Sequence, residues 1–265
     1  MSEDESMAMV VMLGVCVLNL GLVFFQTTRH ASLRSAPGPW GLVGAAWGLA
    51  LLVLFGILRE LSSHDVRESP IYLSFYLLMG AAWVSLAVKL LRFYDWRFAE
   101  DVLERRNVAA ALAQGGATVG IMLAFAGGNI GDGPGWWVVV GCAILSTAAL
   151  LAVGWGAVCL TGWTREITVE RHLGAGLLAG LFFVAGGLIA GRAVAGDWTS
   201  LEETLADFWQ LIVPLPILGL LAVLLQKAGQ WAAGQRLYGL GTGLAGGIVL
   251  LGFALGSLYW AGAIK

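Results

Sequence analysis

The chain has 265 residues, of which 58% are hydrophobic and only 12% are charged, and its formal net charge at pH 7 is -2. Soluble domains carry roughly 25% charged residues, so this composition excludes an ordinary soluble domain and predicts a membrane protein. The nearly balanced charge gives no indication of nucleic-acid binding. The three cysteines (Cys16, Cys142 and Cys159) fall inside apolar segments, which favours a packing role over a disulfide or metal framework.

Eight apolar segments follow one another along the chain, each close to the ~20 residues with which a helix crosses a hydrocarbon core. They lie at about 7–26, 39–58, 71–91, 108–127, 136–161, 173–191, 206–226 and 238–260. The sequence therefore predicts an all-α transmembrane fold, an eight-helix bundle that forms a single membrane domain over residues 1–265.

Lys and Arg gather mainly in the loops that follow the first, third, fifth and seventh segments. The opposite side of the predicted bundle holds Arg59, Arg67, Arg192 and Lys265. Loops rich in Lys and Arg face the cytoplasm. We therefore expect a multi-pass protein of the bacterial cytoplasmic (inner) membrane, with both termini on the periplasmic or external side.

Small residues recur at a period of 65 in the second, fourth, sixth and eighth segments. The recurring positions, which we predict to be helix-packing positions, are Gly44, Ala46, Ala50, Ala109, Ala111, Gly115, Gly174, Gly176, Gly180, Gly239, Gly241 and Ala245. In each segment the last two lie four residues apart and share a helix face, and small residues let helices approach closely in lipid. Gly and Ala are common in any membrane helix, but agreement in all four segments at one register favours a true repeat.

An even division of the segments gives four two-helix hairpins, at about 7–58, 71–127, 136–191 and 206–260. A hairpin returns the chain to the side from which it started. All four hairpins are therefore predicted to be parallel repeats, unlike the inverted repeats of many carriers. The dipeptides Gly131-Asp132 and Gly196-Asp197 fit the same period, because they lie 65 residues apart just past the outer end of a segment.

Arg106, Arg171 and Arg236 are also spaced by 65 residues, at the predicted cytoplasmic entry to a helix. Such arginines can attract anions or lipid phosphate, but positively charged anchors are the default at this boundary, and we favour anchoring. Asn107 is expected to cap the following helix through its side chain. His172 occupies the equivalent position and fits a polar boundary residue better than a pH switch.

Pro214 and Pro216 fall inside the seventh apolar segment. Proline removes a backbone hydrogen bond and predicts a kink here. A broken helix can expose carbonyls to an ion or substrate, but a packing kink is the simpler interpretation, because membrane helices tolerate proline. Just before them, Ser200 and Glu203 have the spacing of a capping box.

A family resemblance is carried by Phe93-Tyr94-Asp95-Trp96, by Glu100, and by the run from Arg106 to Ala113 with the glycine-rich helix after it. Through these residues the third to sixth segments resemble the bacterial membrane family called domain of unknown function 350. The run from Gly186 to Asp197 is similar to the second half of that family. The second copy departs from the pattern by having His172 in place of asparagine, and the last copy lacks the Tyr-Asp pair. The resemblance implies a multi-pass inner-membrane protein of tandem hairpins, and it implies no activity.

Ionisable side chains are nearly absent from the middle of the segments, where transporters and intramembrane proteases keep carboxylates, histidines or metal ligands. The sequence shows no nucleophile–base pair, phosphate-binding loop or redox motif, so we expect no enzymatic activity, cofactor or metal. The expected function is that of a non-enzymatic scaffold or accessory subunit of a membrane complex. Its expected partners are the lipid bilayer and other membrane chains, either further copies or different proteins. The alternative is a channel or facilitator for ions or a small solute.

Overall fold

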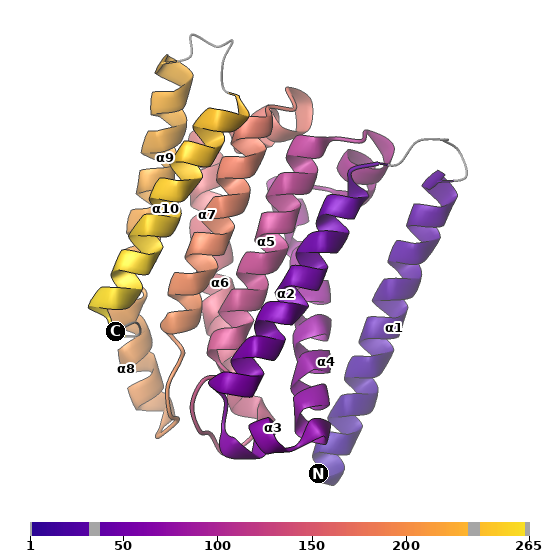
Figure 1. Cartoon of the computed structure of the whole chain (residues 1–265), viewed down its shortest axis with the longest axis vertical. Coiled ribbons are helices and arrows are strands. Elements are labelled where there is room, and N and C mark those ends of the chain that lie inside the picture. The colour runs from indigo at the N-terminus through magenta and orange to yellow at the C-terminus, as the bar shows by residue number, and fades with distance from the viewer. Residues whose placement is uncertain (1, 32–37, 233–238, 263–265) are drawn as a thin grey trace.

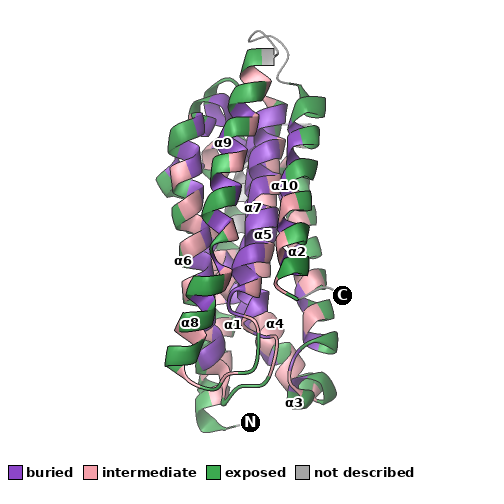
Figure 2. Cartoon of the chain, turned by 90° about the vertical axis from the view of Figure 1, so that its left-hand side faces the viewer, coloured by how far each residue is buried: buried purple, intermediate pink, exposed green. Residues whose placement is uncertain are grey.

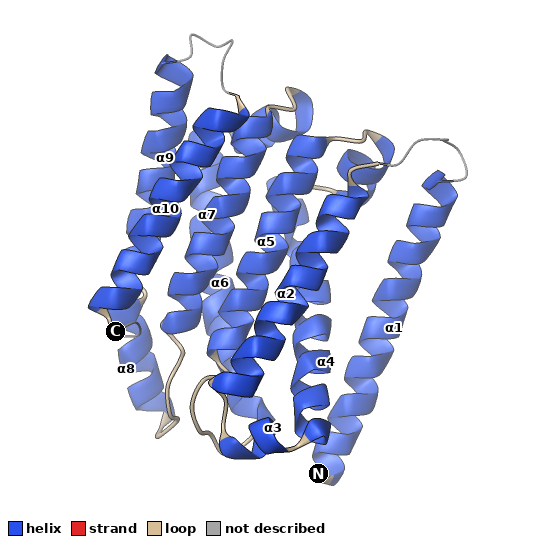
Figure 3. Cartoon of the chain, viewed as in Figure 1, coloured by secondary structure: helices blue, strands red, loops and turns tan. Residues whose placement is uncertain are grey.

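The computed structural model describes residues 2–31, 38–232 and 239–262 of the chain. Over these residues the regular structure is helical and includes no strand, as Figure 3 shows. The elements in chain order are α1 (Glu3–Ala31), α2 (Trp40–Glu60), α3 (His64–Glu68), α4 (Pro70–Ala87), η1 (Val88–Tyr94), η2 (Phe98–Glu104), α5 (Val108–Gly127), α6 (Trp136–Thr161), η3 (Arg165–Val169), α7 (Leu173–Arg192), α8 (Leu201–Leu211), α9 (Pro214–Ala232) and α10 (Leu240–Trp260). Of these, η1 is a 3₁₀ helix, and η2 and η3 are π-helices. The all-α prediction is confirmed.

Seven helical stretches are long and apolar enough to cross a membrane, counted over the described residues. They are Trp40–Glu60, Pro70–Tyr94, Val108–Gly127, Trp136–Thr161, Leu173–Arg192, Leu201–Trp231 and Leu240–Trp260. This set fits a multi-pass membrane protein. Helix α1 runs along the same bundle in Figure 1, but some of its side chains lie outside the described part of the chain. The count of eight spans therefore stays a prediction.

The long helices form two rows. Helices α2, α5, α7 and α10 contact one another in that order and make one row, which lies nearer the viewer in Figure 1. Behind it, α1 contacts α4, and α6 contacts α9. Contacts of α5 and α7 with α6, and of α7 and α10 with α9, join the rows. Helix α1 begins and α10 ends toward the lower part of Figure 1.

The core of the molecule is centred on α5 and α7. These helices bury 78% and 72% of their most apolar stretches, against 22% for α2 and 28% for α10. Figure 2 shows the same contrast, with the buried colour concentrated on the two central helices. Their residues are mostly Gly and Ala, so the backbones approach closely and gain dispersion contacts along their length.

Side-chain caps fix the start of several helices, among them α5 and α8. The Asn107 side chain accepts a hydrogen bond from the backbone N–H of Ala110 at 3.2 Å, which is the cap that the sequence predicts for α5. The Ser200 hydroxyl accepts a hydrogen bond from the backbone N–H of Glu203 at 3.1 Å and caps α8. Each cap satisfies one of the free N–H groups of a first helical turn.

The predicted kink at Pro214 and Pro216 is a break between two helices. Helix α8 ends at Leu211, and Pro214 is the first residue of α9. Proline is well tolerated at this place, because the N–H that it lacks has no partner in a first helical turn. Pro216 lies in the same first turn, so both prolines begin a helix instead of distorting the middle of one.

Candidate functional site

Helices α5 and α7 lie so close that the backbone of one contacts the backbone of the other. A Cβ atom placed on Gly120 would lie 2.1 Å from the carbonyl oxygen of Phe183, and one on Gly176 would lie 2.3 Å from that of Ala109. These distances are far below van der Waals contact, so hydrogen is the largest substituent that fits. The small residues of these helices therefore close the interface completely.

The twelve predicted packing positions differ in how far the structure buries them. Seven are buried, namely Ala50, Ala109, Ala111, Gly115, Gly174, Gly176 and Gly180. Ala46 is half-buried and faces Gly115, on which a Cβ atom would lie 3.2 Å from the Ala46 methyl group. These eight positions lie on the α2, α5 and α7 helices.

The other four predicted packing positions lie on exposed surface: Gly44, Gly239, Gly241 and Ala245. The structure corrects the prediction for α10. This helix meets α7 through Gly243 and Gly247, which pack against Gly174 and Leu181. Gly241 and Ala245 each precede one of these contact residues by two positions. Two residues correspond to about half a turn of an α-helix, so the predicted residues point away from α7.

Two buried carboxylates lie at the end of the bundle that carries η2 and η3, which we call the π-helix end. Asp101 is 2% exposed and Glu166 is 9% exposed, and the two residues are 65 positions apart. The backbone carbonyl of Asp101 accepts a hydrogen bond from the N–H of Asn107 at 2.9 Å, and that of Glu166 accepts one from the N–H of His172 at 2.9 Å. The π-helical turn therefore turns each carboxylate toward the protein interior.

The residue before each capping position has left-handed backbone geometry. Arg106 has a φ of 52° and Arg171 a φ of 56°, a conformation uncommon for residues other than glycine. Arg171 is exposed and Arg106 is half-buried. Arg236, the third arginine of the predicted set, lies outside the described residues.

The carboxylate of Asp101 is bound by the two residues that flank its own helix, η2. Its carboxylate accepts hydrogen bonds from the backbone N–H of Arg97 at 2.9 Å and from Nη1 of Arg105 at 3.2 Å. Burial raises the pKa of Asp101, and the hydrogen bond from Arg97 and the charge of Arg105 act in the opposite direction. Asp101 is therefore a structural acid that ties the two ends of η2 together.

Glu166 is held by a different helix, α9. Its carboxylate accepts hydrogen bonds from Nε2 of Gln226 at 2.5 Å and from the side-chain amide of Gln230. Gln226 is fully buried, and its Oε1 accepts a hydrogen bond from Nε1 of Trp163 at 3.0 Å. We call these four residues the Glu166 network. It joins the end of α6, the π-helix η3 and α9 through polar contacts in an otherwise apolar interior.

His172 lies at the edge of this network. Its Nδ1 is 3.5 Å from a carboxylate oxygen of Glu170 and 3.9 Å from one of Glu166. Its side chain does not cap α7. The equivalent residue, Asn107, caps α5 and also donates from Nδ2 to the carbonyl of Ile167 at 2.6 Å. Asn107 thereby links the start of α5 to the turn that carries Glu166.

The raised pKa of Glu166 predicts how stability depends on pH. Burial raises the pKa of this carboxyl, and the hydrogen bonds from Gln230 and Gln226 lower it by less. The folded state therefore binds this proton more tightly than the unfolded state, in which the pKa is about 4.3. The resulting stabilisation is complete below that value and is lost as the pH rises through the raised folded pKa.

The free energy of unfolding in detergent should therefore gain a contribution as the pH falls from neutral toward about 4.3. Glu166→Gln should reduce this slope without abolishing it, because burial also raises the pKa of Asp101. Glu68→Gln, which changes an exposed carboxyl, should leave the slope as it is. An identical slope in the Glu166→Gln variant would contradict the prediction.

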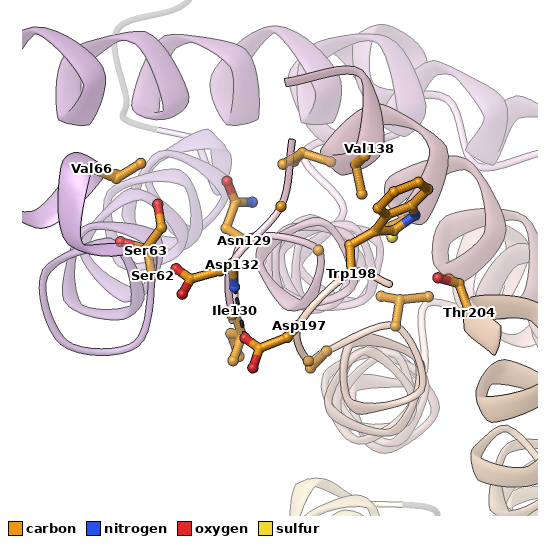
Figure 4. A pocket seen from close by; sticks show the side chains of 18 of the residues that line it. Ser62, Ser63, Val66, Asn129, Ile130, Asp132, Val138, Asp197, Trp198 and Thr204 are labelled. Atoms are coloured by element: carbon orange, nitrogen blue, oxygen red, sulfur yellow. Dashed lines mark hydrogen bonds between the residues drawn. The ribbon is translucent and has the colours of Figure 1, made fainter. Parts of the chain in front are cut away.

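The opposite end of the bundle, which we call the loop end, holds a cavity of about 70 Å³ (Figure 4). It is lined by the turn after α2, the loop between α5 and α6, and the loop between α7 and α8. Backbone hydrogen bonds join these segments, from Gly131 to Leu61 at 3.2 Å and from Gly196 to Ile130 at 3.0 Å. The side chain of Asp197 accepts a further hydrogen bond from the N–H of Asp132 at 2.8 Å.

Asn129 lines this cavity and is 6% exposed. Its Nδ2 donates to the carbonyl of Phe125 at 3.1 Å. Its Oδ1 is buried and has no hydrogen-bond partner among the described residues. The assignment of the two amide atoms follows from the contact with Phe125, because a carbonyl oxygen there requires a donor.

Sequence reasoning did not single out Asp101, Glu166, Gln226 or Asn129. The 65-residue period contained a usable signal for the first two, since it aligns an acid with an acid just before each capping position. Gln226 and Asn129 had no such signal. Each is a lone amide, and its importance depends on partners that the fold brings together.

The chain matches one family model, described as Domain of Unknown Function (DUF350), over residues 57–194. The match begins near the end of α2 and runs to the residues just after α7. It includes the α5–α7 interface, both π-helices and Asn129, whereas Gln226 and Asp197 lie beyond it. No curated protein and no solved structure matches the chain. Because the match covers more than half of its residues, and because it contains the resembling motifs, this chain belongs to the DUF350 family.

Proposed function

We propose that this protein is a non-enzymatic scaffold or accessory subunit of a complex in the bacterial cytoplasmic membrane. The observation that carries the proposal is the closed α5–α7 interface. A conducting protein needs a water-filled path through its centre, whereas the centre of this chain is a contact in which Gly120 and Gly176 touch the facing backbone. Such a centre supports a rigid module better than a pore within one chain.

We also propose that α1 is an eighth span and that the chain consists of four parallel hairpins. The residues before α5 and those 65 positions later, before α7, have the same local structure, and this agreement supports the repeat. It includes the left-handed residues Arg106 and Arg171, the buried acids Asp101 and Glu166, and the π-helix before each of α5 and α7. With eight crossings both termini lie on one side, which the distribution of Lys and Arg predicts to be periplasmic or external.

The outer helices supply surface for partners. Helices α2, α9 and α10 carry large apolar side chains that the rest of the chain leaves exposed, including Leu52, Leu224 and Ile248. In a membrane such residues contact lipid or another apolar helix. Among the described residues, the buried carboxylates Asp101 and Glu166 lie at the π-helix end and are bound by structural partners, which supports a role without catalysis.

Crosslinking in native membranes tests the scaffold proposal. A photoreactive residue at Leu52 or Leu224 should give discrete adducts with another membrane chain, because both positions are exposed on outer helices. The same residue at Leu86, exposed on α4, shows whether the partner covers one face or several. A photoreactive residue at fully buried Ala117 should crosslink only within the chain. If every exposed position yields lipid adducts alone, the scaffold proposal fails.

Flux into proteoliposomes tests the alternative of a channel or facilitator. With purified protein we expect the movement of labelled ions and small metabolites to equal that of empty vesicles, since the central interface is closed. Flux above that of empty vesicles that saturates with substrate would favour the facilitator and count against the scaffold. A variant that loosens the centre, described in the Discussion, provides a control for nonspecific leakage.

A further inference from the structure

Helix α7 receives α5 on a face of four glycines. A Cβ atom placed on any of them would lie 2.6 Å or less from a backbone carbonyl oxygen of α5. The four are Gly176, Gly180, Gly187 and Gly191. They form two pairs of small residues spaced by four, which is the pattern with which membrane helices approach one another closely.

The residues 65 positions later, on α10, keep this small-residue face but leave it open. They are Gly241, Ala245, Gly252 and Gly256. All four are exposed, and a Cβ atom on any of the three glycines would meet no atom of the described residues within 4 Å. Helix α10 packs on α7 through other positions, on the opposite side of the helix. The face that binds a helix in α7 is therefore present in α10 without a helix on it.

The equivalent face of α7 indicates what kind of partner the open face of α10 fits. Its occupant, α5, is a helix that runs in the same direction as α7, because the contacts progress from Ala109 with Gly176 to Leu123 with Gly191. Within one copy, α10 contacts α7 and α9, and both lie on its buried side. A parallel helix on the open face must therefore come from another chain.

Helix α2, at the other end of the row, has an open face of the same kind. This outer face of α2 consists of exposed residues, namely Gly41, Ala45, Gly48, Leu52 and Gly56. A Cβ atom on its glycines would meet no atom of the described residues within 4 Å. Helices α2 and α10 are each 21 residues long, and both run from the π-helix end toward the loop end (Figure 1). Residues 200 positions apart are therefore expected at similar depths in a membrane.

At matched depths the two open faces are complementary in size. Leu52 of α2, which is 69% exposed, would face Gly252 of α10, and Ile248 of α10, which is 59% exposed, would face Gly48 of α2. The other pairs join two small residues, namely Gly41 with Gly241, Ala45 with Ala245 and Gly56 with Gly256. Two α10 faces placed together at equal depth would instead set Ile248 against Ile248. The pairing of α2 with α10 therefore fits better than either helix with itself.

We propose that a second copy of this chain docks its α2 on α10 of the first, so that the row α2, α5, α7 and α10 continues from copy to copy. This inference rests on the proposed scaffold function, for which it names one partner. The new contact extends the small-residue packing already present between α5 and α7, in which closely approaching backbones gain dispersion contacts. Because the contact is head-to-tail, it produces rings or open arrays of copies and not an isolated symmetric dimer.

Cysteine crosslinking between two differently tagged copies in native membranes tests the contact. Both copies carry Cys159→Ser, because Cys159 is exposed, and one carries Ala45→Cys while the other carries Ala245→Cys. Mild oxidation should join them, since a disulfide needs Cα atoms within about 7 Å. Ala152→Cys, at an exposed position of α6, replaces Ala45→Cys to measure random collision.

The outcomes separate the alternatives. A mixed disulfide well above the collision control supports the contact. Stronger crosslinking of Ala245→Cys with itself would overturn the pairing of α2 with α10 in favour of a symmetric dimer. Crosslinking no stronger than the collision control, in protein that elutes as a folded species, would overturn self-association and leave these faces to lipid.

Filling the open face of α10 tests the fit of the side chains. Gly252→Leu adds a side chain where Leu52 of the second copy would lie, and it should reduce the mixed disulfide on the order of tenfold through overpacking. Leu52→Ala in the other copy should restore part of it. Gly141→Leu makes the same change on α6, where a Cβ atom also meets no described atom within 4 Å, and should have no effect. An equal yield with and without Gly252→Leu would refute the fit.

Photocrosslinking at Leu224 separates this inference from the scaffold proposal. Leu224 is exposed on α9, outside both open faces. Adducts there with a different membrane chain, together with no disulfide between copies, would remove self-association while the scaffold proposal stands. Lipid adducts alone at every exposed position would remove both.

Discussion

Gly120→Ala is expected to destabilise the protein by about 3 kcal/mol, the upper end of what overpacking costs. The new methyl carbon would lie 2.1 Å from the carbonyl oxygen and 2.5 Å from the carbonyl carbon of Phe183. These are backbone atoms of α7, so no side-chain rotation can relieve the clash, and the two central helices must separate. Separation also weakens the packing of Gly187, on which a Cβ atom would lie 2.2 Å from the Gly120 carbonyl. Reversible unfolding in mixed micelles measures the change.

A second glycine provides the matched control. A Cβ atom placed on Gly156 of α6 would meet no atom of the described residues within 4 Å. Gly156→Ala makes the same chemical change without a clash, and alanine favours a helix over glycine by about 1 kcal/mol. This variant should be neutral or slightly stabilised. Equal stability of the two variants would show that α5 and α7 do not meet at Gly120. The loosened Gly120→Ala protein also serves as the leakage control for the flux experiment.

Gln226→Leu is expected to destabilise the protein by a comparable amount, about 3 kcal/mol, through loss of hydrogen bonds and not through a clash. Gln226 donates to Glu166 and accepts from Trp163, and all three residues are buried. Leucine fills nearly the same volume and leaves two groups unpaired, an indole N–H and part of a carboxylate. Each such group costs about 1–3 kcal/mol. Chemical unfolding at neutral pH measures the loss.

The double variant Gln226→Leu with Glu166→Leu separates the network from simple packing. It removes the carboxylate that lacks a donor, so it should recover part of the stability that Gln226→Leu loses. Gln210→Leu makes the same substitution at an exposed position of α8 and should be close to neutral. If the double variant loses the sum of the two single effects, Glu166 and Gln226 are not coupled.

The sequence predicts the helices of this protein well, because their ends carry strong local signals. The expected segments 108–127 and 136–161 coincide with α5 and α6. The expected segment 206–226 is the exception, because Pro214 begins α9 where the sequence predicts only a kink. The cap of α5 is a local signal, since Asn107 contacts the N–H of a residue only three positions along the chain. These signals depend on residues next to each other in the sequence, so a single sequence is sufficient to find them.

The register between helices could not be predicted in the same way. A stripe of Gly and Ala shows that one helix face is small, but it does not show which neighbour that face meets. Gly241 follows the period and is exposed, while Gly243 makes the contact with α7. The Glu166 network could not be predicted for a related reason, because Gln226 lies 60 residues from Glu166 along the chain. Only the packing of α9 on η3 brings an isolated amide to a buried acid.

The row in which α2, α5, α7 and α10 touch in order also bears on biogenesis. Each of these helices packs on the one synthesised before it, so a nascent helix leaving the translocon finds its docking surface already in the bilayer. The contact between α5 and α7 can form before α10 is synthesised, and α10 then covers Gly174 of α7. The order of translation is therefore also an order of assembly, and it keeps the exposed intermediates short.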